Sequence, residues 1–432
     1  MNDNSNKFKL VLTGIFAFFI LLGVVAFSTF KSNSPSNSKI EINVWGVVDK
    51  TIFDNYITKY KQDKNLEFKL AYTYKSLSTI DNELIEAIAT DKAPDAILIP
   101  HELEKRYLDK VSMITSITER VFKDTFVQEA ELYIQPTGVF ALPFFVDPLV
   151  MYWNRDMFSS ASIANPPTKW TEFPSLADKL SQSDNNANII KSVAPLGEFK
   201  NVDNAKALLS TLIMQAGSPI VSFADSFFKS KLDYQSPTDI MVPANSALLF
   251  FTDYSNPKKS VYSWNRSLPS SKQFFLSEDL ALYFGFASEY KDIKEKNPNL
   301  NFDVAMIPQS IDLKAPRITF GELYGFSILK SSPNALPTFN LLSLLTGPDS
   351  VSTLLDFIDV APARRDLISA GSSNPAKTIF FNSALISHGW VDPDSKKTNQ
   401  IFQDMVENIT TGRMDIPSSV SKASMELDNL LQ

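Results

Sequence analysis

Five short segments near the start of the chain have hydrophobic patterns that are typical, in turn, of a strand and of a helix. Apolar and polar residues alternate over 40–45 and 66–74, as they do in half-buried strands, and 96–100 reads Ala-Ile-Leu-Ile-Pro, typical of a strand covered on both faces. Between these strands, 51–61 and 78–91 place apolar residues at helical spacing. Strand, helix, strand, helix and strand in this order predict a parallel sheet and an α/β fold.

A longer apolar and aromatic run, Gly138 to Phe158, contains two prolines. Proline cannot donate a hydrogen bond to a strand ladder, so Pro143 and Pro148 are expected at strand ends, on an edge or at a bend. The run therefore predicts an extended crossover strand whose aromatic end is Tyr152-Trp153-Asn154.

The rest of the chain predicts further helices and strands. A strand is expected over 302–308, and 318–329 is either a strand pair or one bent strand. The expected helices cover 170–180, 205–216, 244–253, 278–291, 336–345 and 400–431, the last with a break near 412–417.

The N-terminus contains 21 residues without a charge, Leu10 to Phe30, between Lys9 and Lys31. About 20 apolar residues span a bilayer as a helix, whereas the apolar part of a cleaved signal has about 7–15. We therefore expect 1–9 to be cytoplasmic, 10–30 to be a transmembrane signal-anchor and 31–39 to be a flexible tether. Ala26-Phe27-Ser28 leaves cleavage open.

Composition excludes several kinds of site. The chain has no cysteine, which excludes disulfides, thiolate metal sites and a lipid-attached cysteine anchor. Two histidines, His101 and His388, are too few for a zinc site built on several histidines. There is no glycine-rich phosphate loop, and the net charge of −7 gives no reason to expect nucleic acid. We expect no cofactor and no metal.

Several motifs in a fixed order resemble the extracellular solute-binding proteins of ABC importers, in the branch that binds sugars and oligosaccharides. Gly138 to Phe144 gives Gly-x-x-Ala-Leu-Pro-Phe, 147–156 gives Asp-Pro-Leu-Val-Met-Tyr-Trp-Asn-Arg-Asp, and 165–170 gives Asn-Pro-Pro-Thr-Lys-Trp. Later come Val-Ala-x-x-Pro (304–308), Gly-x-x-Tyr-Gly-Phe-Ser-Ile (321–328) and Ala-Pro-Ala-Arg-Arg (361–365). One departure is Glu278-Asp279, where the family commonly has a glycine.

The resemblance implies a two-lobed periplasmic-binding-protein-like α/β fold of type II that closes on its ligand by hinge motion. We place lobe I at 40–156 plus 306–358 and lobe II at 157–305 plus 359–432. A ligand site is expected at the carboxyl ends of the strands. The partners implied are a small-molecule carbohydrate and the ABC permease subunits, and the protein is expected to be monomeric.

The ligand-binding candidates come from the resemblance and from their position near the cleft. The Asp-Lys pair after the first strand maps to Asp49 and Lys50, the pair after the third strand to His101 and Glu102, and a family tyrosine to Trp153. The remaining candidates are Trp45, Trp264, Glu322, Tyr324, Arg364 and Trp390.

Several of these residues have an alternative structural role. Trp45 and Trp153 are equally consistent with core or hinge packing. Asp49 and Lys50 are consistent with capping of the helix that starts near Thr51, and His101 with a turn. The pair Arg364-Arg365 is consistent with a surface that faces the permease.

Two other functions remain open. Glu102 and Glu322 facing each other across a cleft would suit glycoside hydrolysis, although no further catalytic set accompanies them. A tethered sensor or adhesin would have the same fold. The main prediction is a binding protein that captures a sugar and is not an enzyme.

Overall fold

The structure is a computed structural model that describes residues 40–224, 227–236, 241–312 and 315–432. From Ile42 onward the chain forms one compact unit. The predicted transmembrane helix at 10–30 and tether at 31–39 lie outside the described residues. Within the described ranges, no helix combines the length and the apolar character that a membrane crossing requires.

The predicted alternation at the start of the chain is confirmed. β1 (Glu41–Gly46), α2 (Lys50–Lys64), β2 (Lys69–Tyr74), α3 (Ile80–Ala89) and β3 (Ala96–Pro100) follow one another. β1 is parallel to β3, with Val44 opposite Ala96, and β2 follows β1 in the sheet order. All five residues of β3 are buried, as expected for a strand covered on both faces.

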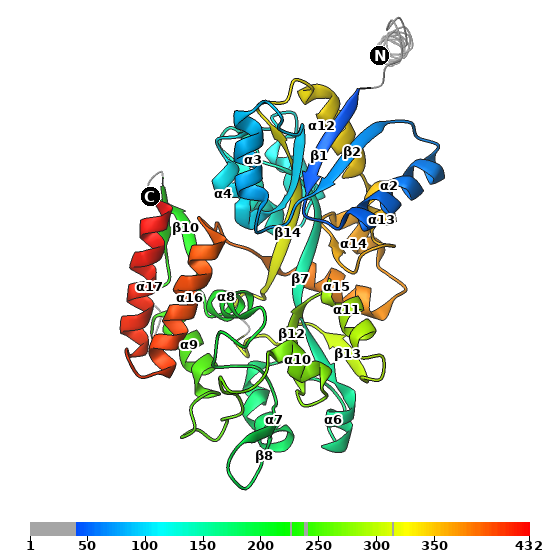
Figure 1. Cartoon of the computed structure of the whole chain (residues 1–432). Helices are drawn as coiled ribbons and strands as arrows, with labels where there is room; N and C mark the ends of the chain where they lie inside the picture. Colours follow the sequence, from blue (N-terminus) through cyan, green and yellow to red (C-terminus); the bar gives the residue numbers. More distant parts are fainter. Residues whose placement is uncertain (1–39, 225–226, 237–240, 313–314) are drawn as a thin grey trace, which may run out of the picture. The chain divides into compact units, whose positions relative to one another are not determined.

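Two long strands, β7 (Leu142–Asn154) and β14 (Thr319–Leu329), form the centre of the sheet, and Figure 1 shows them running beside each other. Among the described residues the main sheet has the order β12-β7-β14-β3-β1-β2. The first half of β7 pairs with β14, and the second half pairs with β12 (Leu282–Phe286) and β13 (Phe302–Ala305). β7 therefore links two groups of strands.

The prolines of β7 stand where the ladder is interrupted, as predicted. Pro143 is opposite Gly325, next to a register shift between Tyr324 and Gly325. Pro148 is the last β7 residue paired with β14, and Leu149 is the first paired with β12. β14 is one strand with this irregularity, which confirms the bent strand over the strand pair.

The helix predicted over 278–291 is wrong. That stretch contains β12, followed by α11 (Glu289–Lys296). Residues 280–285 are buried throughout, because β12 pairs with β7 and is covered on both faces. A strand buried on both faces has no alternating pattern, so its apolar run resembles that of a buried helix.

The other predicted helices are present, and Figure 1 shows the last two, α16 and α17, side by side. The helices not yet given are α4 (Glu104–Tyr107), α5 (Glu119–Thr125), α6 (Arg155–Ser160), α7 (Phe173–Leu180), α8 (Ala205–Gln215), α9 (Pro243–Asp253), α10 (Ser271–Leu276), α12 (Ala335–Leu345), α13 (Pro348–Leu354), α14 (Arg365–Ala370), α15 (Pro375–Ala384), α16 (Ser395–Thr410) and α17 (Ile416–Leu431), with 3-10 turns η1 (His101–Leu103), η2 (Gln128–Tyr133) and η3 (Trp170–Glu172).

Short strands complete the described part of the fold. They are β4 (Val111–Ser112), β5 (Ile134–Gln135), β6 (Gly138–Val139), β8 (Gln182–Ser183), β9 (Ile189–Lys191), β10 (Val221–Ala224), β11 (Phe227–Ser230), β15 (Ala361–Pro362) and β16 (Ser387–His388). β10 and β11 form an antiparallel hairpin.

The departure at Glu278 has a backbone consequence. Glu278 has a φ of 65°, in the left-handed region that glycine adopts without strain. Its side chain accepts a hydrogen bond from Asn297 Nδ2 at 3.2 Å. The position thus keeps a glycine-like conformation while it carries a side chain.

We predict that Glu278→Gly is more stable than Glu278→Ala by about 1 kcal/mol, because only the alanine keeps a Cβ in the left-handed region. Both variants lose the bond to Asn297, so the comparison isolates the backbone. Urea unfolding of the two proteins measures the difference. Equal stability would contradict the strain at this position.

Candidate functional site

A cavity of about 410 Å³ lies at the carboxyl end of β3, and we call it the polar cavity. Glu102 in η1 directly follows β3, Lys206 is the second residue of α8, and Phe286 ends β12. Glu322 comes from β14, which runs antiparallel to β3 and pairs Tyr324 with Pro100. The lining includes Glu102, Asn204, Lys206, Phe286, Phe320, Glu322, Ser395 and Asn399.

Lys206 is the centre of a buried ion network. Its Nζ lies 3.0 Å from Glu102 Oε1 and also donates to Asp392 Oδ2. Ser395 Oγ donates to Glu102 Oε2 at 2.8 Å, and Thr398 Oγ1 donates to both Asp392 oxygens at 2.9 Å. The lysine and both carboxylates thus have partners, which buried charges require.

The network determines the charge of its members. Burial acts to raise the pKa of Glu102, but the Lys206 ammonium and neighbouring groups outweigh it and hold that pKa below its ordinary value. Burial acts to lower the pKa of Lys206, but Glu102 and Asp392 outweigh it and raise that pKa. Both groups are charged at neutral pH.

A second carboxyl group faces the same cavity in a different state. Burial, with the nearby charge of Glu102, raises the pKa of Glu322 to about 8. Tyr324 Oη donates to Glu322 Oε2 at 2.7 Å, and the Tyr324 ring stacks on Phe145 with 4.6 Å between centroids. At neutral pH Glu322 is therefore largely protonated and has a proton to donate.

Asp147 on β7 stands directly opposite Glu322 on β14. Its Oδ1 accepts a hydrogen bond from the Ser288 backbone at 3.0 Å, and burial raises its pKa to about 7. Asp147 and Glu102 both act electrostatically on Glu322. Glu322 is thus under the influence of two other carboxyl groups, Glu102 and Asp147, and of the Lys206 ammonium.

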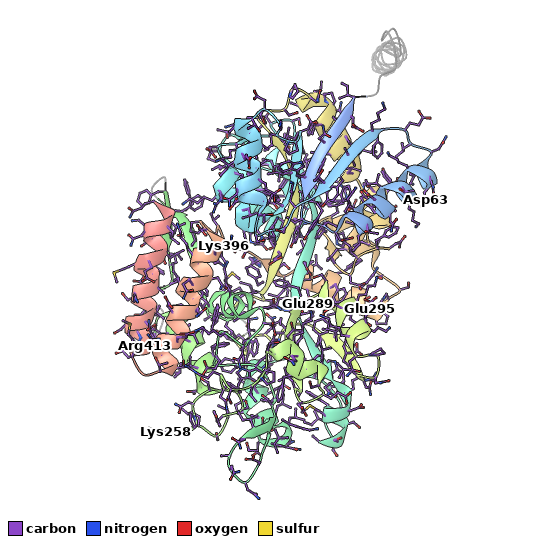
Figure 2. The ribbon with its side chains drawn as sticks, viewed as in Figure 1. Asp63, Lys258, Glu289, Glu295, Lys396 and Arg413 are labelled. Atoms are coloured by element: carbon purple, nitrogen blue, oxygen red, sulfur yellow. The ribbon has the colours of Figure 1, made fainter. Side chains whose placement is uncertain are left out.

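Glu289, labelled in Figure 2, supports the wall of the polar cavity from α11. Its Oε1 accepts from the Phe286 backbone at 2.9 Å and from Asn204 Nδ2 at 2.8 Å. Asn204, in the left-handed conformation, precedes α8. One carboxylate therefore fixes both the aromatic wall and the start of the helix that carries Lys206.

The structure brings Glu102, Glu322 and Tyr324 together, but it gives His101 a different setting. His101 is 2% exposed, and its Nδ1 accepts from the Leu323 backbone at 3.2 Å. A Cβ on Gly389 would lie 2.3 Å from His101 Nε2, so the ring fills the space against Gly389. Burial lowers the pKa of His101 to about 4, and the ring is neutral. It packs inside the protein.

The pair after the first strand takes the capping role. Asp49 Oδ1 accepts from the backbone of Thr51 at 2.8 Å and of Ile52 at 3.1 Å, which caps α2. Lys50 forms an exposed ion pair with Asp54 at 2.7 Å. Neither lines the polar cavity.

The tryptophans are placed by packing. Trp264 is fully buried, with Nε1 donating to Asn201. Trp153 contacts Phe158 and lies six residues beyond Asp147 on β7, roughly 20 Å along the strand. Trp45 has Lys75 Nζ at 4.1 Å over its ring.

The two candidates late in the chain also lie outside the polar cavity. Arg364 forms two hydrogen bonds with Asp366, at 3.0 and 2.8 Å. Trp390 is 3% exposed, stacks on Phe402 and donates from Nε1 to Ser210 Oγ. Trp390 lines a separate cavity of about 690 Å³ at the other end of α8, which we call the apolar cavity.

Sequence reasoning missed Asp147, Lys206, Phe286, Asp392 and Asn399. Lys206 had a usable signal, because it is the single charge in the strongly apolar run 205–216. Asp392 had none, because it lies 186 residues from Lys206 along the chain. Asn399 is exposed and lines the polar cavity, so its amide can form hydrogen bonds with a ligand there.

A model of the bacterial extracellular solute-binding protein family matches residues 55–379. The match covers more than half of the chain, and the protein belongs to this family. Its globular part is therefore extracytoplasmic, and the family consists of binding proteins. A search of curated proteins finds no match.

Two solved structures show the same two-lobed α/β fold. A cyclo/maltodextrin-binding protein complexed with maltotetraose has a TM-score of 0.74 at 14% identity, covering 92% of this chain and 99% of that one. An ABC transporter solute-binding protein from Thermotoga lettingae TMO, bound with α-D-tagatose, has a TM-score of 0.68 at 16% identity, covering 91% and 100%. The predicted two-lobed α/β fold is confirmed, whereas the lobe boundaries and the N-terminal transmembrane helix stay predictions.

We predict that Lys206→Met lowers the free energy of unfolding by about 3–5 kcal/mol near neutral pH, because it leaves two buried carboxylates without a cation. Uncompensated carboxylates bind protons more tightly in the folded protein, so the loss shrinks as pH falls. Urea unfolding across a pH series measures both effects.

Lys200→Met is the matched control, since Lys200 lines the same cavity but is 70% exposed. It is expected to change stability by less than about 0.5 kcal/mol. Lys206→Met/Asp392→Asn should recover part of the loss. A Lys206→Met protein as stable as the wild type would contradict the network.

We predict that Glu322→Gln removes a pH dependence of stability. The folded pKa of Glu322 is about 8 against an ordinary 4.5, so the unfolded chain loses this proton first as pH rises. Relative to Glu322→Gln, the free energy of unfolding of the wild type should therefore decrease as pH rises from about 4.5 to about 8. Glu295→Gln, at an exposed α11 residue labelled in Figure 2, is the control. A constant difference between wild type and Glu322→Gln would contradict the buried, protonated state.

Proposed function

We propose that this protein binds a carbohydrate in the polar cavity and delivers it to an ABC permease. The observation that carries the proposal is the composition of that cavity. Glu102, Lys206, Glu322 and Asn399 present charged, protonated and amide groups beside the rings of Phe286 and Phe320. Sugars have hydroxyl edges and apolar ring faces, which match such polar groups and aromatic rings.

The family and the fold support a carbohydrate as ligand. Two proteins with the same fold hold maltotetraose and tagatose, both of them sugars. The fold alone does not identify the ligand, because proteins with one fold bind many different solutes. The composition of the polar cavity supplies the physical argument for this chain.

The proposed mechanism is a shift between open and closed arrangements of the two lobes. Glu102 comes from the predicted lobe I (40–156) and Lys206 from the predicted lobe II (157–305), so their ion pair crosses the predicted boundary. Lys396 on α16, labelled in Figure 2, also donates to the Ser78 carbonyl oxygen at 3.3 Å. A ligand that contacts both sides binds the closed state better and increases its population.

We further propose that the chain is anchored in the cell membrane by 10–30 as a single-pass helix, with 31–39 as a tether. The 21 uncharged residues and the lack of a cysteine for lipid attachment support this anchoring. The partners are then the permease subunits and the ligand, and the protein acts as a monomer. A tethered sensor is the alternative, and sugar uptake by cells lacking the chain distinguishes the two.

The charge states of Glu102 and Glu322 also resemble those of a glycoside hydrolase. Glu102 is ionised and Glu322 is protonated at neutral pH. A glycoside hydrolase needs one carboxyl group in each of these states. However, the Lys206 ammonium and Ser395 stabilise the Glu102 carboxylate and lower its pKa, so Glu102 can accept hydrogen bonds but is a weak base and a weak nucleophile. The arrangement favours binding without chemistry.

The test is thermal unfolding of the purified protein against a panel of mono- and oligosaccharides, with peptides and phosphorylated polyols as controls. A ligand at about 100 times its dissociation constant adds roughly 2.7 kcal/mol of stability, which raises the unfolding midpoint. We expect an intact glycan to give this shift. A cleaved glycan would favour hydrolysis, and a panel without any shift would contradict the sugar assignment.

The site is tested with two variants on one helix. Asn399→Leu removes an amide that lines the polar cavity, and Gln400→Leu changes the next residue, which is equally exposed, does not line the cavity and is bonded to Asp404. We expect Asn399→Leu to weaken glycan binding about tenfold, as loss of one or two hydrogen bonds would. Gln400→Leu should leave the affinity unchanged. Equal effects would place the ligand elsewhere.

A further inference from the structure

The apolar cavity, of about 690 Å³, is not used by the proposed function. It lies at the C-terminal end of α8, whereas the polar cavity lies at the N-terminal end, and the two share no lining residue. α8 has 11 residues and is therefore about 16 Å long. The volume is within the range of small-molecule sites, about 300–1,000 Å³.

The polar side chains that line this cavity already have partners within the protein. Ser218 Oγ donates to the Lys231 carbonyl oxygen at 2.8 Å, and Gln135 Nε2 donates to Glu104 at 2.7 Å. His388 Nδ1 is 3.2 Å from the Ile386 carbonyl oxygen. Little hydrogen-bonding capacity is left for the hydroxyl groups of a sugar. The cavity therefore suits apolar surface.

Aromatic rings form much of its wall. Phe223 and Phe228, on the β10–β11 hairpin, meet edge to face with centroids 5.1 Å apart. Phe223 is 60% exposed, although it lines the cavity. The protein's own lysines already lie over two neighbouring rings, Lys105 over Phe228 at 5.9 Å and Lys206 over Trp390 at 5.3 Å. These rings present faces that attract cations.

The charge at the rim has the complementary sign. Glu119 and Glu131 both line the cavity, and they share one ammonium group, Lys123 Nζ, at 2.8 and 3.1 Å. These two carboxylates and one lysine give this side of the rim a net negative charge, while the Lys105 ammonium lies on the side of Phe228. The side formed by Glu119 and Glu131 therefore attracts cations, most strongly at low salt.

We propose that the apolar cavity is a second binding site, for an aromatic ring that bears a positively charged amine. The ring packs against Phe223, Phe228 and Trp390, and the amine lies toward Glu119 and Glu131. This site goes beyond the proposed function and does not depend on it, since it shares no lining residue with the polar cavity. A ligand can bind in the apolar cavity whether or not a sugar is bound in the polar cavity.

The test uses two probes with the same ring and opposite charge, naphthylmethylamine and naphthylacetate. Each is titrated calorimetrically into the whole protein without sugar. We expect the amine to bind saturably at one site, about tenfold more tightly than the acetate at low salt. The difference should narrow as salt rises. Equal affinities, or no saturable binding of the amine, would overturn the proposal.

Two phenylalanines of the hairpin give a matched pair of variants. Phe223→Ala removes a ring that lines the cavity, and Phe227→Ala removes a ring that is 47% exposed and does not line it. We expect Phe223→Ala to weaken the amine about fivefold, and Phe227→Ala to leave it unchanged. Both residues are exposed, so both variants should fold, which circular dichroism checks. Equal losses would show non-specific adsorption to the hairpin and overturn the site.

A third variant tests the charge. Glu131→Gln keeps the shape of the rim and removes one of the two carboxylates beside Lys123. The amine should then lose most of its advantage over the acetate, while the acetate binds no more weakly than before. An unchanged preference for the amine would contradict the role of the rim.

Discussion

The ion network of Glu102, Lys206 and Asp392 is the constraint on which the polar cavity depends. Lys206 is 8% exposed and Asp392 is 2% exposed, so neither charge is compensated by water. Desolvation of such charges is costly, and only the pairing within the network offsets it. Because the three residues come from the end of β3, the start of α8 and the segment before α16, pairing them fixes these elements relative to one another. The cavity walls follow from that placement.

The paired strands β7 and β14 supply the other half of the site. They place Asp147 and Glu322 opposite each other, and burial raises the pKa of both carboxyl groups. Glu102, by contrast, is kept ionised by Lys206. The polar cavity thus contains a charged hydrogen-bond acceptor, Glu102, and an uncharged hydrogen-bond donor, Glu322. A neutral, hydroxyl-rich ligand can use both.

The sequence predicted those parts of the fold that local patterns determine. The alternation up to Pro100 and the helices 205–216 and 244–253 follow from hydrophobic period alone. The helix predicted over 278–291 failed, because β12 is buried on both faces and has no strand-like alternation. The interruptions of the strand ladder at Pro143 and Pro148 were predictable, since proline has no backbone donor.

The site was predictable only in part. Glu102 was predicted from the family resemblance, Glu322 and Tyr324 from their expected position in the cleft, and the structure brings the three together. Asp392 was missed because its pairing with Lys206 joins residues 186 apart, and no local pattern reports such a contact. Trp264 was a ligand-binding candidate, and the structure buries it fully. The residue type alone does not reveal whether an aromatic ring belongs to the core or packs against a ligand. Packing decides that, and packing is non-local.

The most direct test of the account is a crystal structure of the protein with the glycan that most raises its unfolding midpoint. The account predicts a sugar ring against Phe286 or Phe320, with hydroxyl groups bonded to Glu102, Glu322 and Asn399. A glycan bound outside the polar cavity, without hydrogen bonds to Glu102, Glu322 or Asn399, would contradict it.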